Sequence, residues 1–235
     1  SLISRPFLNS RPDAAVVTYV NSTAEVKAES DVCCTSSNAV RVVESIPPDR
    51  PVIFVPDRNL ARYVVERTGR DNLIAWDGYC YVHDDMVLVE LESARKAHPE
   101  AKVVVHPEAR KDLLDQADFV TSTSGMVRLA AEHDELIIGT ERGLVDRLTQ
   151  VYQNKTLIPL SGAAICGNMK LNTVAKLAWS LDHGQHEIVL DERVRVRAES
   201  ALRRMLELSG GWRAPSAEEQ ALEDAGLRQS GCGCP

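Results

Sequence analysis

The chain has 235 residues, of which 44% are hydrophobic, 26% charged and only 5% aromatic, and its formal net charge is −7 at pH 7. Such an acidic chain lacks the electrostatic footprint for a polyanion, so we expect no nucleic-acid partner. No run of about 18 apolar residues occurs and the opening residues do not resemble a secretory signal, so we expect a cytoplasmic protein that does not span a membrane.

The predicted elements repeat with a period of about 87 residues. The apolar stretch AVVTYVNST at 15–23 matches KVVVHPEAR at 102–110, and CCTSSNAVR at 33–41 matches FVTSTSGMVR at 119–128. Short apolar runs such as VIFV and LIIG predict strands, and the segments between them have helical spacing. We therefore predict an α/β fold of tandem, pseudo-symmetric three-layer α/β/α domains with parallel sheets, over residues 1–80 and 81–166.

The chain beyond Cys166 is too short for another domain of this kind. Its pattern predicts a helix from Gly167, a strand over HEIVL at 186–190 and an amphipathic helix with Asp191 as its N-cap. We expect residues 167–209 to pack on another, partial domain. Residues 210–235 are rich in Gly, Ser and Glu and are predicted to form a flexible tail.

Polar residues follow the predicted strands at matching points of both repeats. Ligands of open parallel sheets bind beyond the carboxyl ends of the strands, so we expect one cleft to collect these residues. They are Tyr19, Asn21, residues 35–38 including Ser36, Cys80, His106, Glu108, residues 122–125 including Ser122 and Thr123, and Cys166.

Two of these features have more than one interpretation. The hydroxyl clusters at 35–37 and 122–124 precede helices, where they could cap the helix or help to bind a phosphate or carboxylate. His106 and Glu108 could form an acid/base pair or be structural. His83, three residues after Cys80, could face the cleft or simply begin the next helix.

The cysteines divide into three groups. Cys33 and Cys34 lie on an apolar strand and are predicted to be core residues. Cys232 and Cys234 lie in the terminal GCGC segment, where metal binding would be adventitious. Cys80 and Cys166 close the two repeats at the same point, so pseudo-symmetry would direct both sulfurs to one axis. Two thiolates are too few for a zinc or iron–sulfur site, and one more repeat upstream would place a third cysteine about six residues before Ser1.

Several segments together resemble the quinolinate synthase family, the iron–sulfur enzymes of NAD biosynthesis, from about residue 14 to 209. These are VTYVNSTAEVKAESDVCCTSSNAV, PDRNLARYV, GYCYVH, VVVHPEA, STSGM, IGTERGL and CGNMKLNT. The resemblance implies three similar α/β/α domains around a pseudo-threefold axis, with one cysteine from each holding a [4Fe–4S] cluster. Cys80 and Cys166 match two of these ligands. The third ligand and most of the N-terminal domain are expected to precede this chain, and 167–209 would pack on that domain.

The resemblance also implies a transferase that condenses iminoaspartate with dihydroxyacetone phosphate to quinolinate, with loss of phosphate and water and with the cluster as Lewis acid. An L-aspartate oxidase or dehydrogenase would supply the iminoaspartate. By position, Glu108 would transfer protons and Tyr19 and His106 would also be catalytic, while the substrate-binding residues would be Tyr19, Asn21, Ser36, His106, Ser122 and Thr123. The alternative is a truncated, inactive remnant that binds a small phosphate or dicarboxylate between two lobes.

Overall fold

The structure is a computed structural model that describes residue 7 and residues 11–211. Its first part is an α/β unit with a four-stranded, all-parallel sheet in the order β2-β1-β3-β4. The elements in chain order are β1 (Ala15–Tyr19), α2 (Ala24–Ala28), β2 (Val32–Cys34), α3 (Ala39–Glu44), β3 (Val52–Val55), α4 (Arg58–Thr68) and β4 (Leu73–Ala75).

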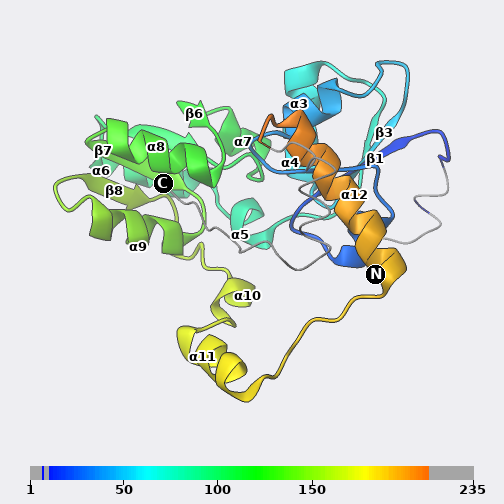
Figure 1. The fold of residues 1–235 in the computed structure, drawn as a ribbon. Helices are drawn as coiled ribbons and strands as arrows, with labels where there is room; N and C mark the ends of the chain where they lie inside the picture. The colour runs from blue at the N-terminus through cyan, green and yellow to red at the C-terminus, as the bar shows by residue number, and fades with distance from the viewer. Residues whose placement is uncertain (1–6, 8–10, 212–235) are drawn as a thin grey trace.

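A second unit of the same topology follows, with the strand order β6-β5-β7-β8. Figure 1 shows the two units next to each other, the first in blue and cyan and the second in green. The elements are α5 (Tyr81–Asp84), α6 (Leu88–Ala97), β5 (Lys102–Val105), α7 (Lys111–Leu114), β6 (Phe119–Val120), α8 (Thr123–Glu132), β7 (Glu135–Gly139), α9 (Arg142–Val151) and β8 (Thr156–Pro159). The predicted tandem of parallel α/β folds is therefore confirmed.

The central strand of each sheet begins with the same contact. The backbone N–H of Val16 donates to Asp31 Oδ2 at 2.8 Å, and that of Val103 donates to Asp118 Oδ2 at 2.9 Å. Each aspartate precedes the neighbouring strand, so one carboxylate fixes where two strands start relative to each other. The sequence repeat is thus matched by a repeat of individual contacts.

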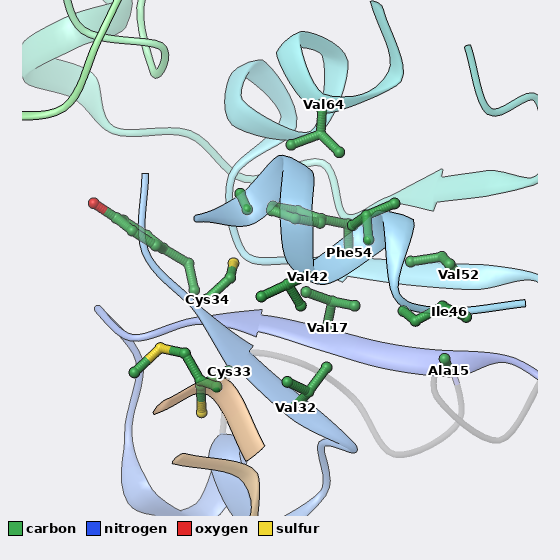
Figure 2. Close-up of a cluster of buried hydrophobic side chains, with 14 of the residues drawn as sticks. Ala15, Val17, Val32, Cys33, Cys34, Val42, Ile46, Val52, Phe54 and Val64 are labelled. Atoms are coloured by element: carbon green, nitrogen blue, oxygen red, sulfur yellow. The ribbon is translucent and has the colours of Figure 1, made fainter. Parts of the chain in front are cut away.

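Apolar strands form the core of the first unit. All five residues of β1 and all four of β3 are buried, as expected for a parallel sheet covered on both faces. Figure 2 shows Cys33 and Cys34 among these apolar side chains, and both are fully buried. The prediction that they are core residues is confirmed.

The chain after Cys166 differs from the prediction in two ways. The single helix expected from Gly167 is divided into α10 (Gly167–Lys170) and α11 (Val174–His183), because Thr173 is extended and caps α11 by accepting from Lys176 N. The strand predicted at 186–190 was wrong. His186 has φ of 65°, which interrupts an extended backbone, and no described strand pairs with this segment.

The last described helix, α12 (Glu192–Leu208), begins at Asp191, which accepts from Arg193 N and Val194 N as predicted for its N-cap. α12 packs on α2 and β2 of the first unit, and the packing of residues 167–209 on a further domain stays a prediction. Ala201 and Met205 join the core of that unit, and α12 crosses it in Figure 1. Of the tail predicted at 210–235, residues 212–235 lie outside the described residues.

Within the described ranges, no helix combines the length and the apolar character that crossing a membrane requires.

Candidate functional site

A cavity of about 530 Å³ lies at the carboxyl ends of the strands and is lined by residues of both units. Of the residues predicted to share a cleft, Tyr19, Asn21, Cys80, Glu108 and Cys166 line it. The rest of the wall includes Ser22, Thr23, Pro56, Asp57, Trp76, Tyr79, Val82, His83, Glu141 and Met169.

The two cysteines occupy equivalent backbone positions in the cavity wall. Cys80 precedes α5 with φ/ψ of −83°/110°, and Cys166 precedes α10 with φ/ψ of −85°/101°. Both thiols are free and partly exposed. Because both cysteines line the same cavity, the two repeats converge on one hollow, as predicted.

Each cysteine turn is held by a carboxylate that the sequence analysis did not single out. Cys80 N donates to Asp57 Oδ2 at 2.8 Å, and Cys166 N donates to Glu141 Oε1 at 3.2 Å. The only sequence signal for this pair was the likeness of PDRNL at 56–60 to TERGL at 140–144.

Buried polar side chains from both units form a network beside Cys80. His83 Nδ1 lies 3.2 Å from Cys80 Sγ, and His83 Nε2 lies 3.0 Å from Thr140 Oγ1. Glu108 Oε2 lies 3.2 Å from His106 Nδ1 and 3.6 Å from His83 Nδ1. The two imidazole rings stack with centroids 4.5 Å apart. Of the two interpretations of His83, the structure supports the one in which it faces the cleft.

Burial controls the protonation of this network. It raises the pKa of Glu108 to about 8, with the charge of Asp57 adding to the effect, and lowers the pKa of His83 to about 4. Burial and the neighbouring His83 hold the pKa of His106 well below its usual value. At neutral pH both rings are therefore uncharged and Glu108 is mostly protonated, so its 3.2 Å contact with His106 Nδ1 joins two neutral groups and is not an ion pair.

Tyr19 and Cys80 are also shifted towards their protonated forms. Burial, followed by the charge of Glu108, raises the pKa of Tyr19 far above its usual value. Burial raises the pKa of the Cys80 thiol to about 11. Tyr19 therefore presents a hydroxyl, not a phenolate, to the cavity, where it can donate a hydrogen bond to an anionic ligand.

The remaining predicted residues lie outside the cavity wall. His106 is 2% exposed and lies behind Glu108, with its Nε2 3.2 Å from Ser36 Oγ. Ser122 caps α8 by accepting from Gly125 N, and Thr123 is the exposed first residue of that helix. Of the two interpretations of the hydroxyl cluster at 122–124, the structure therefore supports helix capping. In the first cluster, Asn38 rather than a hydroxyl closes the turn, by accepting from Thr35 N at 2.6 Å.

The donors at the cavity suit a metal centre. Ligand atoms of Cys80, His83 and Glu108 lie within 4.8 Å of one another, and Cys166 adds a second thiol to the same wall. Soft thiolates favour zinc and iron–sulfur centres. Of the cysteines that the structure describes, Cys33 and Cys34 cannot contribute because both are enclosed in the core.

Comparison with known proteins identifies the family of the chain. The family described as "NadA: Quinolinate synthetase A protein" matches residues 4–207. The chain is 49% identical over 198 residues to quinolinate synthase of Desulforudis audaxviator, an alignment that covers 83% of this chain and 65% of the relative. It is 48% identical over 204 residues to the Dehalococcoides mccartyi (strain CBDB1) enzyme, covering 86% of this chain and 67% of the relative.

A third relative, quinolinate synthase of Methanoregula boonei, is 48% identical over 199 residues, covering 84% of this chain and 65% of the relative. The chain therefore spans about two thirds of the length of the curated relatives that it matches. With a family match over most of its length and this level of identity, the chain belongs to the quinolinate synthetase A family.

Proposed function

We propose that this chain carries the cavity of a quinolinate synthase. The reaction joins iminoaspartate and dihydroxyacetone phosphate and releases one phosphate and two waters for each quinolinate formed. The observation that carries the proposal is that Cys80 and Cys166, from equivalent turns of two units, line one cavity together with Glu108. An L-aspartate oxidase or dehydrogenase acting in the cytoplasm would supply the iminoaspartate.

The donor set fits two corners of a [4Fe–4S] cluster. Cys80 and Cys166 would hold it together with a third thiolate. When bound, such a cluster supplies a Lewis acid for dehydration. The side chains of this chain would bind the substrates and transfer protons.

Tyr19 and Asn21 bind substrate oxygens, since a hydroxyl and an amide on the cavity wall can donate to the carboxylates and phosphate of both substrates. Glu108 moves the proton: its carboxyl reaches the cavity and titrates near neutral pH, which suits a group that must both accept and return a proton. His106 orients Glu108 through the 3.2 Å contact. Trp76, Val82 and Met169 make part of the wall apolar.

Reconstitution under anaerobic conditions tests the proposal. The protein encoded by the complete reading frame is incubated with ferrous iron and sulfide, desalted and analysed for iron, and then supplied with both substrates. We expect about four irons per chain and formation of quinolinate. A chain that takes up no iron and makes no quinolinate, yet binds phosphate or a dicarboxylate, would instead be the binding remnant.

Cysteine variants test the ligand assignment. Cys80→Ser and Cys166→Ser should each abolish cluster assembly, because each removes a thiolate that no other described residue can replace. The control variant Cys232→Ser/Cys234→Ser changes cysteines outside the described residues and should keep its iron. Iron content and visible absorbance measure the outcome, and a cluster retained in Cys80→Ser or Cys166→Ser contradicts the assignment.

A further inference from the structure

Two carboxylates hold the cysteine turns in the same way. Asp57 accepts from Leu60 N through Oδ1 at 2.7 Å and from Cys80 N through Oδ2 at 2.8 Å. Each oxygen therefore has its own donor, one at the start of α4 and one in the turn that carries the thiol. Asp57 is 2% exposed, so water does not compete for these bonds.

The second unit repeats this arrangement with a longer side chain. Glu141 accepts from Gly143 N through Oε2 at 2.7 Å and from Cys166 N through Oε1 at 3.2 Å, and it is 8% exposed. Lys170 Nζ lies 3.1 Å from the same Oε1.

A backbone hydrogen bond beside each carboxylate fixes the direction of the cysteine turn. Arg58 N donates to Gly78 O at 2.7 Å, and Arg142 N donates to Ala164 O at the same distance. In both units the residue two positions before the cysteine is thus bound to the residue that follows the carboxylate. At Gly78 the approach is so close that a β-carbon would collide with the carbonyl oxygen of Pro56.

A third contact joins the two turns to each other. The hydroxyl of Tyr81, the residue after Cys80, accepts from the N–H of Gly167, the residue after Cys166, at 2.9 Å. The two thiol-bearing backbones are therefore held to their own units by the carboxylates and to one another by this hydroxyl.

We propose that Asp57, Glu141 and Tyr81 are positioning residues that preset the separation and direction of the Cys80 and Cys166 thiols before any metal binds. The inference rests on the proposed function for its purpose, but the geometry it describes belongs to the metal-free chain. Partners of this kind behind metal ligands influence affinity strongly, since their loss typically weakens metal binding about 10- to 100-fold.

The test uses the full chain carrying Cys232→Ser/Cys234→Ser, with Asp57→Asn, Glu141→Gln or Tyr81→Phe added. An amide at position 57 or 141 keeps the size of the side chain but turns one acceptor into a donor that faces an N–H group. Asp191→Asn is the matched control, because it makes the same change at the N-cap of α12 and touches neither cysteine turn.

Two measurements on the metal-free protein report the metal affinity of the two thiols and the distance between them. Cd²⁺ titration, followed by thiolate charge-transfer absorbance, gives the affinity of the pair. Dibromobimane, which becomes strongly fluorescent once both of its arms have alkylated thiols, reports their separation. We expect Asp57→Asn and Glu141→Gln each to weaken Cd²⁺ binding about ten-fold and to reduce bridging. Tyr81→Phe should reduce bridging, and Asp191→Asn should change neither signal.

Thermal melting identifies variants that fail to fold. If Asp57→Asn does not fold, the proposal is judged on Glu141→Gln and Tyr81→Phe. Tyr81→Phe removes one oxygen from an exposed side chain and should fold. Parental affinity and bridging in the folded variants would overturn the proposal, as would an equal loss in Asp191→Asn. A chain that forms no quinolinate but shows the expected Cd²⁺ results would refute the proposed function and leave the positioning role standing.

Discussion

Glu108 combines three properties that seldom occur together in one carboxyl group. It is 6% exposed, it reaches a cavity that also contains two thiols, and it is in contact with two imidazoles that burial keeps neutral. Glu141, in contrast, is paired with Lys170. Glu108 has no such partner among the described residues, which leaves its proton available for transfer.

Glu108→Gln should lower the rate of quinolinate formation by about 100-fold or more, the usual contribution of a positioned acid/base group. Iron content should stay at the parental level, because the thiols are unchanged. Glu135→Gln is a matched control, since Glu135 also contacts a histidine, His98, at 2.7 Å but lies away from the cavity. Rates and iron per chain are measured together, and a parental rate in Glu108→Gln would remove it from the mechanism.

Repeated contacts give the two units their common geometry at the level of elements. Asp31 and Asp118 start the central strands, and Asp57 and Glu141 start α4 and α9. In every case a carboxylate accepts from a backbone N–H that the parallel sheet or the helix leaves without a partner. The spacing of the strands therefore depends on two exposed carboxylates, Asp31 and Asp118, and the direction of the cysteine turns on two buried ones, Asp57 and Glu141.

Asp118→Asn should lower the free energy of unfolding by about 1 kcal/mol at pH 7, since one acceptor of a backbone N–H is replaced by a donor. Burial alone would raise the pKa of Asp118. The N–H of Val103 and the ammonium of Lys102 outweigh this effect and hold the pKa below its usual value. The ionised carboxylate therefore stabilises the fold above the ordinary aspartate pKa, and this contribution is lost as the pH falls through the folded-state value.

Urea unfolding of parent and Asp118→Asn between pH 7 and about pH 2 measures the difference, which should vanish at the acid end. Asp134→Asn is the control, because the side chain of Asp134 is almost fully exposed. A difference that is constant with pH would show that the charge of Asp118 contributes nothing.

The sequence predicted most of these elements, because apolar runs and helical spacing are local patterns and the repeat supported each of them twice. It could not predict the role of Asp57 or Glu141. Each lies more than 20 residues from the cysteine that it contacts, and only the fold brings the two together. The strand expected at 186–190 failed for a related reason: its apolar residues suit a strand, but a strand requires a neighbouring backbone to pair with.

For the whole molecule, the important feature is that α12 returns to the first unit after the chain has built the second. Met205 packs into the same core as Cys33 and Val32. Asn38, which closes the turn that carries Ser36, donates to Ser209 Oγ at 2.8 Å. Ser209, near the end of the described residues, thus stabilises the Asn38 turn near their beginning.

Met205→Ala should lower the free energy of unfolding by about 2 to 3 kcal/mol, the usual cost of truncating a buried large side chain. Leu206→Ala is the matched control on the same helix, because Leu206 is 37% exposed and should cost well under 1 kcal/mol. Guanidinium unfolding curves compare the two, and equal losses would mean that α12 does not contribute to the core.

Between α11 and α12 the backbone is open to solvent, and the side chains of Ile188 and Val189 are both more than 80% exposed. A protease could sever the peptide there without touching either sheet. The released helix would then be retained only by its contacts with the first unit, which include the burial of Ala201 and Met205 and the ion pair of Arg197 with Glu29. Its escape would withdraw Ser209 from Asn38, some 170 positions away in the sequence. An intact connection between α11 and α12 therefore stabilises the turn that carries Ser36, the residue that contacts His106.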